Sequence, residues 1–207
     1  MGTGLPQRYI NYIFYERRAL LERLVKGEQI SYEKMMLEFT RTTPIIVTCG
    51  PAGLSGSVKM VGFVPREEHL EELVRRAEEY TYAKTSGRML RDVSRVLLEE
   101  FYREDMIDFR KLGGLEMAFN HTWRNIKATG KATLVFYTPP NTSFEVRCKV
   151  EIHEDDTDLY KRYLNAMHDI FHKPRSGRSS YPAYVFIVEE IYDQSNTREG
   201  FGKKIYP

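Results

Sequence analysis

Residues 144–153 read Phe144-Glu145-Val146-Arg147-Cys148-Lys149-Val150-Glu151-Ile152-His153, and apolar and polar side chains alternate along them. Successive side chains of a β-strand point to opposite faces of a sheet, so the apolar set lies on one face and the charged set on the other. The pattern predicts a half-buried strand, with one face on a core and one face in water, as is typical of antiparallel sheets.

Segments around this strand predict more β-structure. Strands are expected at 115–119, 132–138 and 183–192, with a turn at Pro139-Pro140-Asn141 between two of them. Thr122 to Thr129 is predicted to form a short helix that ends at Gly130. Asp156 is expected to cap a second helix that runs to Phe171. The C-terminal part of the chain is therefore predicted to be a sheet with two helices.

The N-terminal half has a different texture. Apolar residues recur at spacings of three and four within 5–40, which predicts helices interrupted at Gly27 and restarted by a Ser31 cap. Residues 43–64 hold two β-branched runs around a Pro/Gly turn and are predicted to form a hairpin. Residues 66–112 are then helical, ending at Gly113-Gly114, and are predicted to be an insertion between strands of one domain spanning 1–207.

Composition sets limits on function. The 207 residues are 42% hydrophobic and 29% charged, which is ordinary for a globular chain, and the net charge of +2 argues against a dedicated duplex-DNA binder. Cys49 and Cys148 lie in apolar runs, so we expect two buried free thiols and no structural zinc. With no secretory signal or membrane span, we expect a cytoplasmic protein, and the abundance of Tyr, Lys, Arg and Glu suits a thermophile.

The segment Asn120-His121-Thr122-Trp123-Arg124-Asn125-Ile126 opens the predicted 122–129 helix. Free backbone N–H groups and the helix dipole favour an anion at such a position, and Thr122 and Arg124 would add a hydroxyl and a fork of donors. The alternative is plain N-capping by Asn120 or Thr122, with Trp123 and Ile126 in the core. Residue types alone favour the alternative.

Ser57 and Lys59 share one face of the predicted hairpin strand, because they are two residues apart. If that face meets the start of the 122–129 helix, an anion site gains a charge and a hydroxyl. The alternative is a solvent-facing strand edge, where lysine is common.

The order of these segments resembles the pyridoxamine-phosphate-oxidase-like and flavin-reductase-like split barrels, which bind FMN. The resemblance covers roughly 43–64, where a strand, a Gly-containing turn and a polar strand follow one another, and 115–192, which includes the stretch from Phe119 to Phe136. It implies an α+β fold, a mostly antiparallel split β-barrel with a helical N-terminus and a helical insertion. The 66–112 segment departs from the family's pattern.

If the resemblance holds, it implies FMN bound at a homodimer interface and an FMN-dependent oxidoreductase of unknown substrate, with redox chemistry supplied by the flavin. The cofactor-binding residues that it implies are Ser57, Lys59, His121, Thr122, Arg124 and Asn125. No catalytic side chain is assigned.

Two other features leave alternatives open. His168 and His172 are four residues apart on a predicted helix and share a face, but no third ligand is evident, so metal binding is not favoured. The run 173–178 is basic, which keeps open a non-catalytic nucleic-acid-binding, regulatory or assembly protein, although a solvated loop is favoured.

Overall fold

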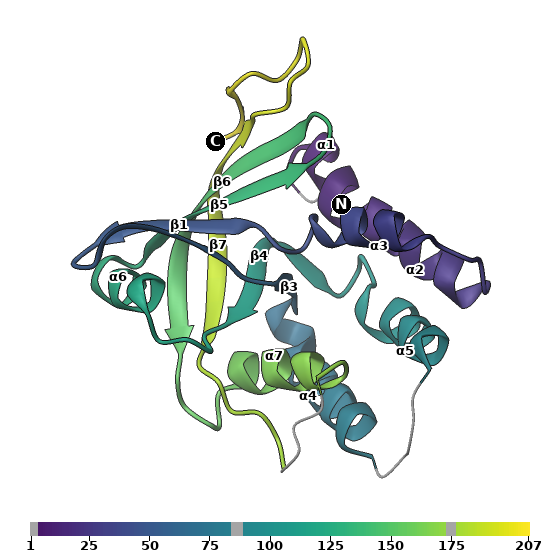
Figure 1. Ribbon diagram of the computed structural model, residues 1–207. Coiled ribbons are helices and arrows are strands. Elements are labelled where there is room, and N and C mark those ends of the chain that lie inside the picture. The colour runs from purple at the N-terminus through teal and green to yellow at the C-terminus, as the bar shows by residue number, and fades with distance from the viewer. Residues whose placement is uncertain (1–3, 84–88, 173–176) are drawn as a thin grey trace.

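The computed structural model describes residues 4–83, 89–172 and 177–207 as one antiparallel sheet flanked by helices (Figure 1). Its strands are β1 Ile45–Gly50, β2 Gly53–Val58, β3 Val61–Pro65, β4 Ile107–Leu115, β5 Lys131–Thr138, β6 Thr142–His153, β7 Ala183–Asp193 and β8 Lys203–Tyr206. Its helices are α1 Gln7–Ile10, α2 Glu16–Val25, α3 Tyr32–Phe39, α4 Glu67–Tyr82, α5 Leu90–Val96, α6 His121–Thr129 and α7 Leu159–Asp169, with π-helical turns η1 Asn11–Tyr15 and η2 Leu97–Phe101.

The strand order explains why the sheet curls. Along the sheet it is β2-β1-β5-β6-β7-β4-β3, every neighbouring pair is antiparallel, and β8 adds to β7. The two end strands, β2 and β3, are consecutive in the chain and are joined only by Lys59 and Met60. This short connection draws the two ends of the sheet together, while no ladder joins β2 to β3 among the described strands. The α+β fold with a split, mostly antiparallel barrel is confirmed.

Strand β6 is the half-buried strand that its alternation predicts. Phe144, Val146, Cys148 and Val150 are buried against the core, whereas Arg147 lies on the outer face. Its neighbours β5 and β7 pair with it along nearly its whole length. The alternation of apolar and polar residues in 144–153 therefore correctly predicts a strand at the centre of the sheet.

The predicted N-terminal helices are confirmed and close one end of the barrel. Tyr9 and Tyr12 pack their rings on Phe136 and Phe144, at centroid distances of 5.1–6.4 Å. The Ser31 hydroxyl accepts the N–H of Lys34 and caps α3, as predicted. Aromatic side chains from helix and sheet thus form one continuous core.

The helical segment ends earlier than the sequence indicates. Strand β4 begins at Ile107, so 66–112 is not helical throughout, and the strand predicted at 115–119 is wrong: residues 116–119 form a turn after β4. Gly113 and Gly114 misled the prediction because they resemble a helix stop. They lie inside the strand, where a Cβ on Gly113 would come within 2.5 Å of Leu164.

Three smaller predictions are corrected. The second run of the hairpin predicted at 43–64 is two strands rather than one, because the chain crosses from one edge of the sheet to the other at Lys59. Asp158, not Asp156, caps α7 by accepting the N–H of Lys161. Cys49 is exposed on the outer face of β1, whereas Cys148 is buried as expected.

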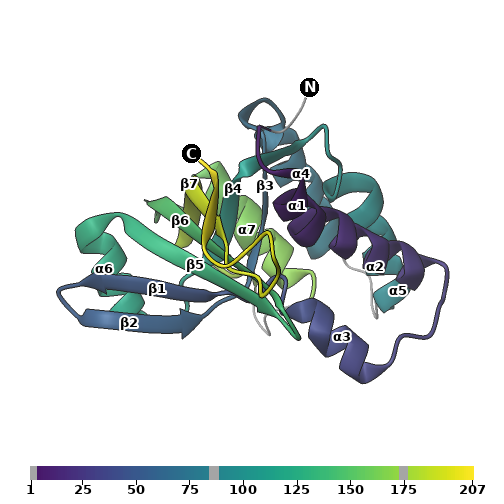
Figure 2. The same ribbon diagram turned by 90° about the horizontal axis from the view of Figure 1, so that it is seen from above.

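Helices α4 and α7 pack together beside the sheet (Figure 2). Arg162 of α7 donates two hydrogen bonds to the carboxylate of Glu78 on α4, at 2.9 and 3.0 Å. Helix α6 instead covers β1 and β2 at the other end of the molecule. In the part of the chain that the structure describes, no helix combines the length and hydrophobicity needed to cross a membrane.

Candidate functional site

The turn between β4 and α6 is built around one buried carboxylate. Glu116 is only 1% exposed, and its Oε1 accepts the backbone N–H of Ala118 at 2.7 Å and of Phe119 at 2.8 Å. Phe119 has a φ of 52°, which is uncommon for a side chain of this size and marks local strain. Glu116 therefore fixes the direction in which the chain enters α6.

The other oxygen of Glu116 joins β7 and the β2–β3 connection to this turn. Its Oε2 accepts the hydroxyl of Tyr184 on β7 at 2.6 Å and lies 3.1 Å from the Lys59 ammonium. Burial alone would raise the pKa of Glu116, but hydrogen bonds from Tyr184, the two backbone N–H groups and Lys59 outweigh it and hold that pKa below its usual value. Burial and the same hydrogen bond raise the pKa of the Tyr184 phenol. The network thus holds a carboxylate, a neutral phenol and an ammonium.

The first turn of α6 is open to a ligand. Asn120 occupies the N-cap position, but its side chain makes no capping hydrogen bond. The Thr122 hydroxyl lies 2.9 Å from that of Ser57 on β2, so the structure brings these two predicted residues together. Capping by the Asn120 side chain is not observed, although Ile126 is buried as the alternative expected. His121 and Arg124 are exposed on the same turn.

Asn125 has a structural role that differs from the roles of the other predicted site residues. Its side chain is fully buried, accepts the N–H of Ala52 at 2.8 Å and donates to the carbonyl of Gly53 at 2.7 Å. It also donates to the hydroxyl of Thr48 at 3.2 Å. Asn125 therefore locks the β1–β2 turn onto α6, which positions Ser57 beside Thr122.

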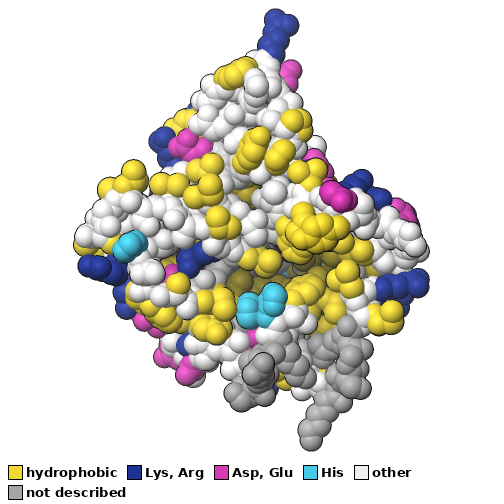
Figure 3. All heavy atoms as spheres, in the orientation of Figure 1, with side chains coloured by type: hydrophobic (Ala, Val, Ile, Leu, Met, Phe, Trp, Pro, Cys, Tyr) yellow, Lys and Arg dark blue, Asp and Glu magenta, His cyan; other side chains and the backbone are white. Residues whose placement is uncertain are grey.

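An apolar pocket of about 410 Å³ begins where Lys59 leaves β2. Its walls come from β3, β4, η2 and α7, and include Val61, Phe63, Phe101, Leu115, Leu164 and Met167. Figure 3 shows the hollow with hydrophobic side chains inside it and histidine at its rim. Arg17 and Lys59 are the only Lys or Arg side chains among its described lining residues. The pocket falls within the 300–1,000 Å³ that is usual for small-molecule sites.

His168 of α7 and His172, which follows the helix, lie at the mouth of this pocket. His168 and His172 both line it, and their ring centroids are 5.0 Å apart. The Nδ1 atom of His168 is 3.1 Å from a carboxylate oxygen of Asp169, which is fully buried. That carboxylate also accepts the hydroxyl of Tyr82 and the N–H of Ser179. Most of the basic 173–178 segment, residues 173–176, lies outside the described residues.

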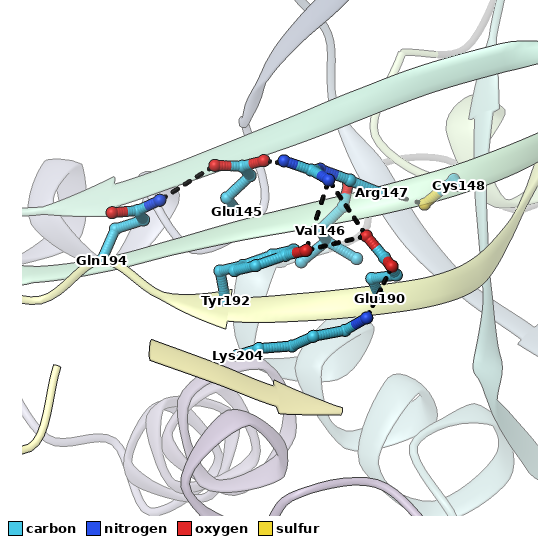
Figure 4. Close-up of polar contacts among 8 residues, drawn as sticks. All are labelled: Glu145, Val146, Arg147, Cys148, Glu190, Tyr192, Gln194 and Lys204. Atoms are coloured by element: carbon cyan, nitrogen blue, oxygen red, sulfur yellow. Dashed lines mark hydrogen bonds and ion pairs between the residues drawn. The ribbon is translucent and has the colours of Figure 1, made fainter. Parts of the chain in front are cut away.

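A second polar cluster lies on the outer face of the sheet (Figure 4), and none of its residues lines the pocket. Arg147 donates to Glu145 at 2.8 Å and to Glu190 at 3.1 Å, and its guanidinium lies over the ring of Tyr192. Glu190 also binds Lys204 of β8 at 2.6 Å. All these groups satisfy one another in or near solvent, so the cluster attaches β8 to β7 and offers no unpaired group to a ligand.

Sequence reasoning missed the buried half of the site. Glu116 and Tyr184 were not singled out, yet they connect Lys59 to α6. A signal was present, because Glu116 stands alone as a charged residue within the apolar run Leu115-Glu116-Met117-Ala118-Phe119. A buried charge in such a run needs partners, and so indicates a site or a structural ion pair.

Comparison with known proteins gives structural likeness only. No protein-family profile matches the chain, and no curated protein matches it significantly. HupZ of Group A Streptococcus aligns over 81% of this chain and 96% of its own, with 14% identity and a TM-score of 0.45. A pyridoxamine 5'-phosphate oxidase-related, FMN-binding protein of Nostoc punctiforme covers 86% of this chain and 99% of its own, with 9% identity and a TM-score of 0.42. An F420 reductase covers 79% and 97%, with 17% identity and a TM-score of 0.41.

Proposed function

We propose that this protein binds FMN, with the phosphate at the first turn of α6 and the ring system in the apolar pocket. The observation that carries the proposal is the uncapped start of α6, which lies beside the paired hydroxyls of Ser57 and Thr122. Two residues beyond Ser57, Lys59 lines the pocket. A polar, donor-rich end and an apolar end thus meet along β2, which matches the two ends of a flavin nucleotide.

The donor set at α6 fits a phosphate. The free N–H groups of a helix N-terminus and its dipole favour an anion, and Arg124 and His121 are exposed on the same turn. Lys59 is paired with Glu116, so its charge is largely balanced and it acts chiefly through its position. Asn125 contributes by holding the hairpin in place, because its own amide is fully used.

The pocket fits an aromatic ring system. Most of its lining side chains are apolar, and the aromatic side chains of Phe63, Phe101, Tyr102, Tyr163 and Phe171 contribute to the walls. Burying apolar surface there stabilises a bound ring by roughly 25 cal/mol for each Å² removed from water.

A bound flavin would supply electron or hydride transfer, and the protein would supply binding, orientation and electrostatics. In this role Ser57, Thr122 and Arg124 hold the anion, and the pocket walls orient the ring. We accordingly propose an FMN-dependent oxidoreductase as the activity.

The outer face of the sheet supports a homodimer as part of this proposal. Ile45 of β1 lies between Val58 of β2 and Val135 of β5 in register, and Ile45 and Val58 are 46% and 66% exposed. Leu54, at the hairpin tip, is 79% exposed. A contiguous apolar strip on a sheet face is typical of an interaction surface, and here it includes β2, the strand that carries Ser57.

The phosphate end is tested by comparing Arg124→Ala with Lys127→Ala. Both remove one positive charge from α6, but Arg124 is in its first half and Lys127 in its last turn. Loss of a charge-assisted hydrogen bond of about 1.5–3 kcal/mol should weaken FMN binding by roughly tenfold or more in R124A. K127A should bind FMN like the parent protein. Equal affinity of the two variants, measured by flavin fluorescence titration, would remove Arg124 from the site.

A further inference from the structure

His168 and His172 at the mouth of the pocket have no role in the proposed flavin binding. His168 lies in the last turn of α7 and His172 three residues beyond its end, and the N–H of His172 donates to the carbonyl of His168 at 3.1 Å. The helical path therefore continues past the end of α7 and keeps both imidazoles on one face. Their rings both line the pocket.

The spacing of the two rings suits a shared metal ion. A transition metal bonds imidazole nitrogen at about 2.0–2.1 Å, so two imidazoles on a tetrahedral metal have ring centroids roughly 5 Å apart. The observed centroid distance between His168 and His172 is 5.0 Å, with the ring planes tilted by 34°. The distance between the two rings is therefore compatible with one nitrogen of each ring binding a common ion.

His168 is also held as metal-binding histidines usually are. Its Nδ1 atom is 3.1 Å from the fully buried carboxylate of Asp169, and the ring of Tyr181 packs edge-on against it at 6.2 Å. A carboxylate that receives one ring N–H fixes the tautomer and leaves the other nitrogen, Nε2, as the ligand. Asp169 is in turn fixed by Tyr82 and Ser179, so this support is rigid.

We propose that His168 and His172 bind one divalent transition-metal ion, Zn²⁺ or a related ion that prefers imidazole, at the mouth of the apolar pocket. Within the described residues no group of three or more His, Cys, Asp or Glu side chains could hold a metal, so the protein supplies two ligands. The remaining positions face the pocket and are filled by water or by a donor atom of the pocket's occupant. Such a site resembles catalytic metal sites in keeping positions open.

The test uses full-length, tag-free, flavin-free protein titrated with Co²⁺ and Zn²⁺. The parent should bind one ion per chain and give the visible bands of nitrogen-ligated Co²⁺. H172Q should lose these bands, and because His172 is exposed the change should leave the fold intact. H69Q, which removes a histidine from α4, should bind as the parent does.

Asp169 acts here as a positioning residue, and D169N separates its two roles. The change that D169N causes in the unfolding midpoint without metal measures how much Asp169 contributes to the stability of the fold. Its effect on the metal-induced rise of that midpoint measures binding alone, and we expect affinity to fall about 10–100-fold. Failure of the parent to bind, or equal Co²⁺ spectra for H172Q and the parent, would overturn the proposal. Because no flavin is present, either outcome leaves FMN binding untouched.

Discussion

Glu116 is the residue on which most of the site depends, because it joins β4 to Lys59, to Tyr184 and to the turn that starts α6. A carboxylate in this position is costly to bury alone and stabilising only when fully hydrogen-bonded. The described partners satisfy both of its oxygens. Substitution of Glu116 should therefore lower both the stability of the fold and the affinity for a ligand.

We expect E116Q to lower the free energy of unfolding at pH 7 by about 1–3 kcal/mol, since Gln cannot pair with Lys59 as an ion. The pKa of Glu116 is lower in the folded chain than its unfolded value of about 4.3. Its ionisation thus stabilises the fold above that pH, and this contribution is lost as the pH falls through the folded pKa. The stability difference between parent and E116Q should shrink on acidification below about pH 4.3, as measured by urea unfolding at several pH values.

E190Q is the matched control, because Glu190 also has a pKa lowered by partners, first by Lys204, but lies near solvent on the outer face. Water screens such pairs, so E190Q should change stability less than E116Q. A pH-independent difference between E116Q and the parent would show that Glu116 is not ionised in the fold.

For individual residues, the sequence predicts which side chains share one face of a strand better than it predicts which residues of other elements they meet. Alternation along β2 placed Ser57 and Lys59 on one face, and Ser57 does meet Thr122. The partner of Lys59 could not be foreseen, because Glu116 faces it only when β4 pairs with β3. In that antiparallel ladder Val61 lies opposite Gly114, and two residues further along Lys59 meets Glu116. The pairing of β3 with β4 is a property of the whole fold and not of a local pattern.

Among the elements, β4 shows why composition misled the prediction. A glycine pair after a helical stretch normally ends a helix. Here Gly113 and Gly114 pair with β3 and β7, and α7 packs so closely on β4 that no side chain fits at Gly113. The packing of α7, which is distant in sequence, thus requires glycine at position 113. Strands β5, β6 and β7 were predicted correctly because their burial pattern is local.

This close packing predicts opposite outcomes for two glycines that face each other in the β3–β4 ladder. A Cβ on Gly113 would come within 2.5 Å of Leu164 and 2.8 Å of Val64, whereas a Cβ on Gly62 would meet nothing within 4 Å. G113A should therefore destabilise the protein by about 1–3 kcal/mol, as overpacked cores do. G62A should be close to neutral. Urea unfolding checks both, and equal stability of the two variants would contradict the packing of α7 on β4.

On the scale of the whole molecule, the sheet presents two unlike halves to one side. Strands β6, β7 and β8 carry the charged network around Arg147, while β2, β1 and β5 carry the apolar row centred on Ile45. The apolar half is the surface that we propose to bury in a homodimer. The charged side chains of the other half already pair with one another, so this half needs no second chain to cover it.

I45K should convert the proposed dimer to a monomer, because the new charge would be buried between two chains. M89K places the same charge at an exposed methionine beyond the sheet and should leave the dimer intact. Sedimentation equilibrium at micromolar concentrations distinguishes the two. A parent protein that sediments as a monomer would end the dimer proposal without bearing on the pocket.

We propose that a polar anion site at α6 and an apolar pocket together hold one flavin nucleotide. The most direct measurement compares FMN with riboflavin, which has the same ring system and no phosphate, by fluorescence titration of the purified protein. We expect saturable binding of FMN and binding of riboflavin that is weaker by roughly tenfold or more, because riboflavin lacks the contacts of the phosphate. Absence of FMN binding, or equal affinity for the two flavins, would contradict it.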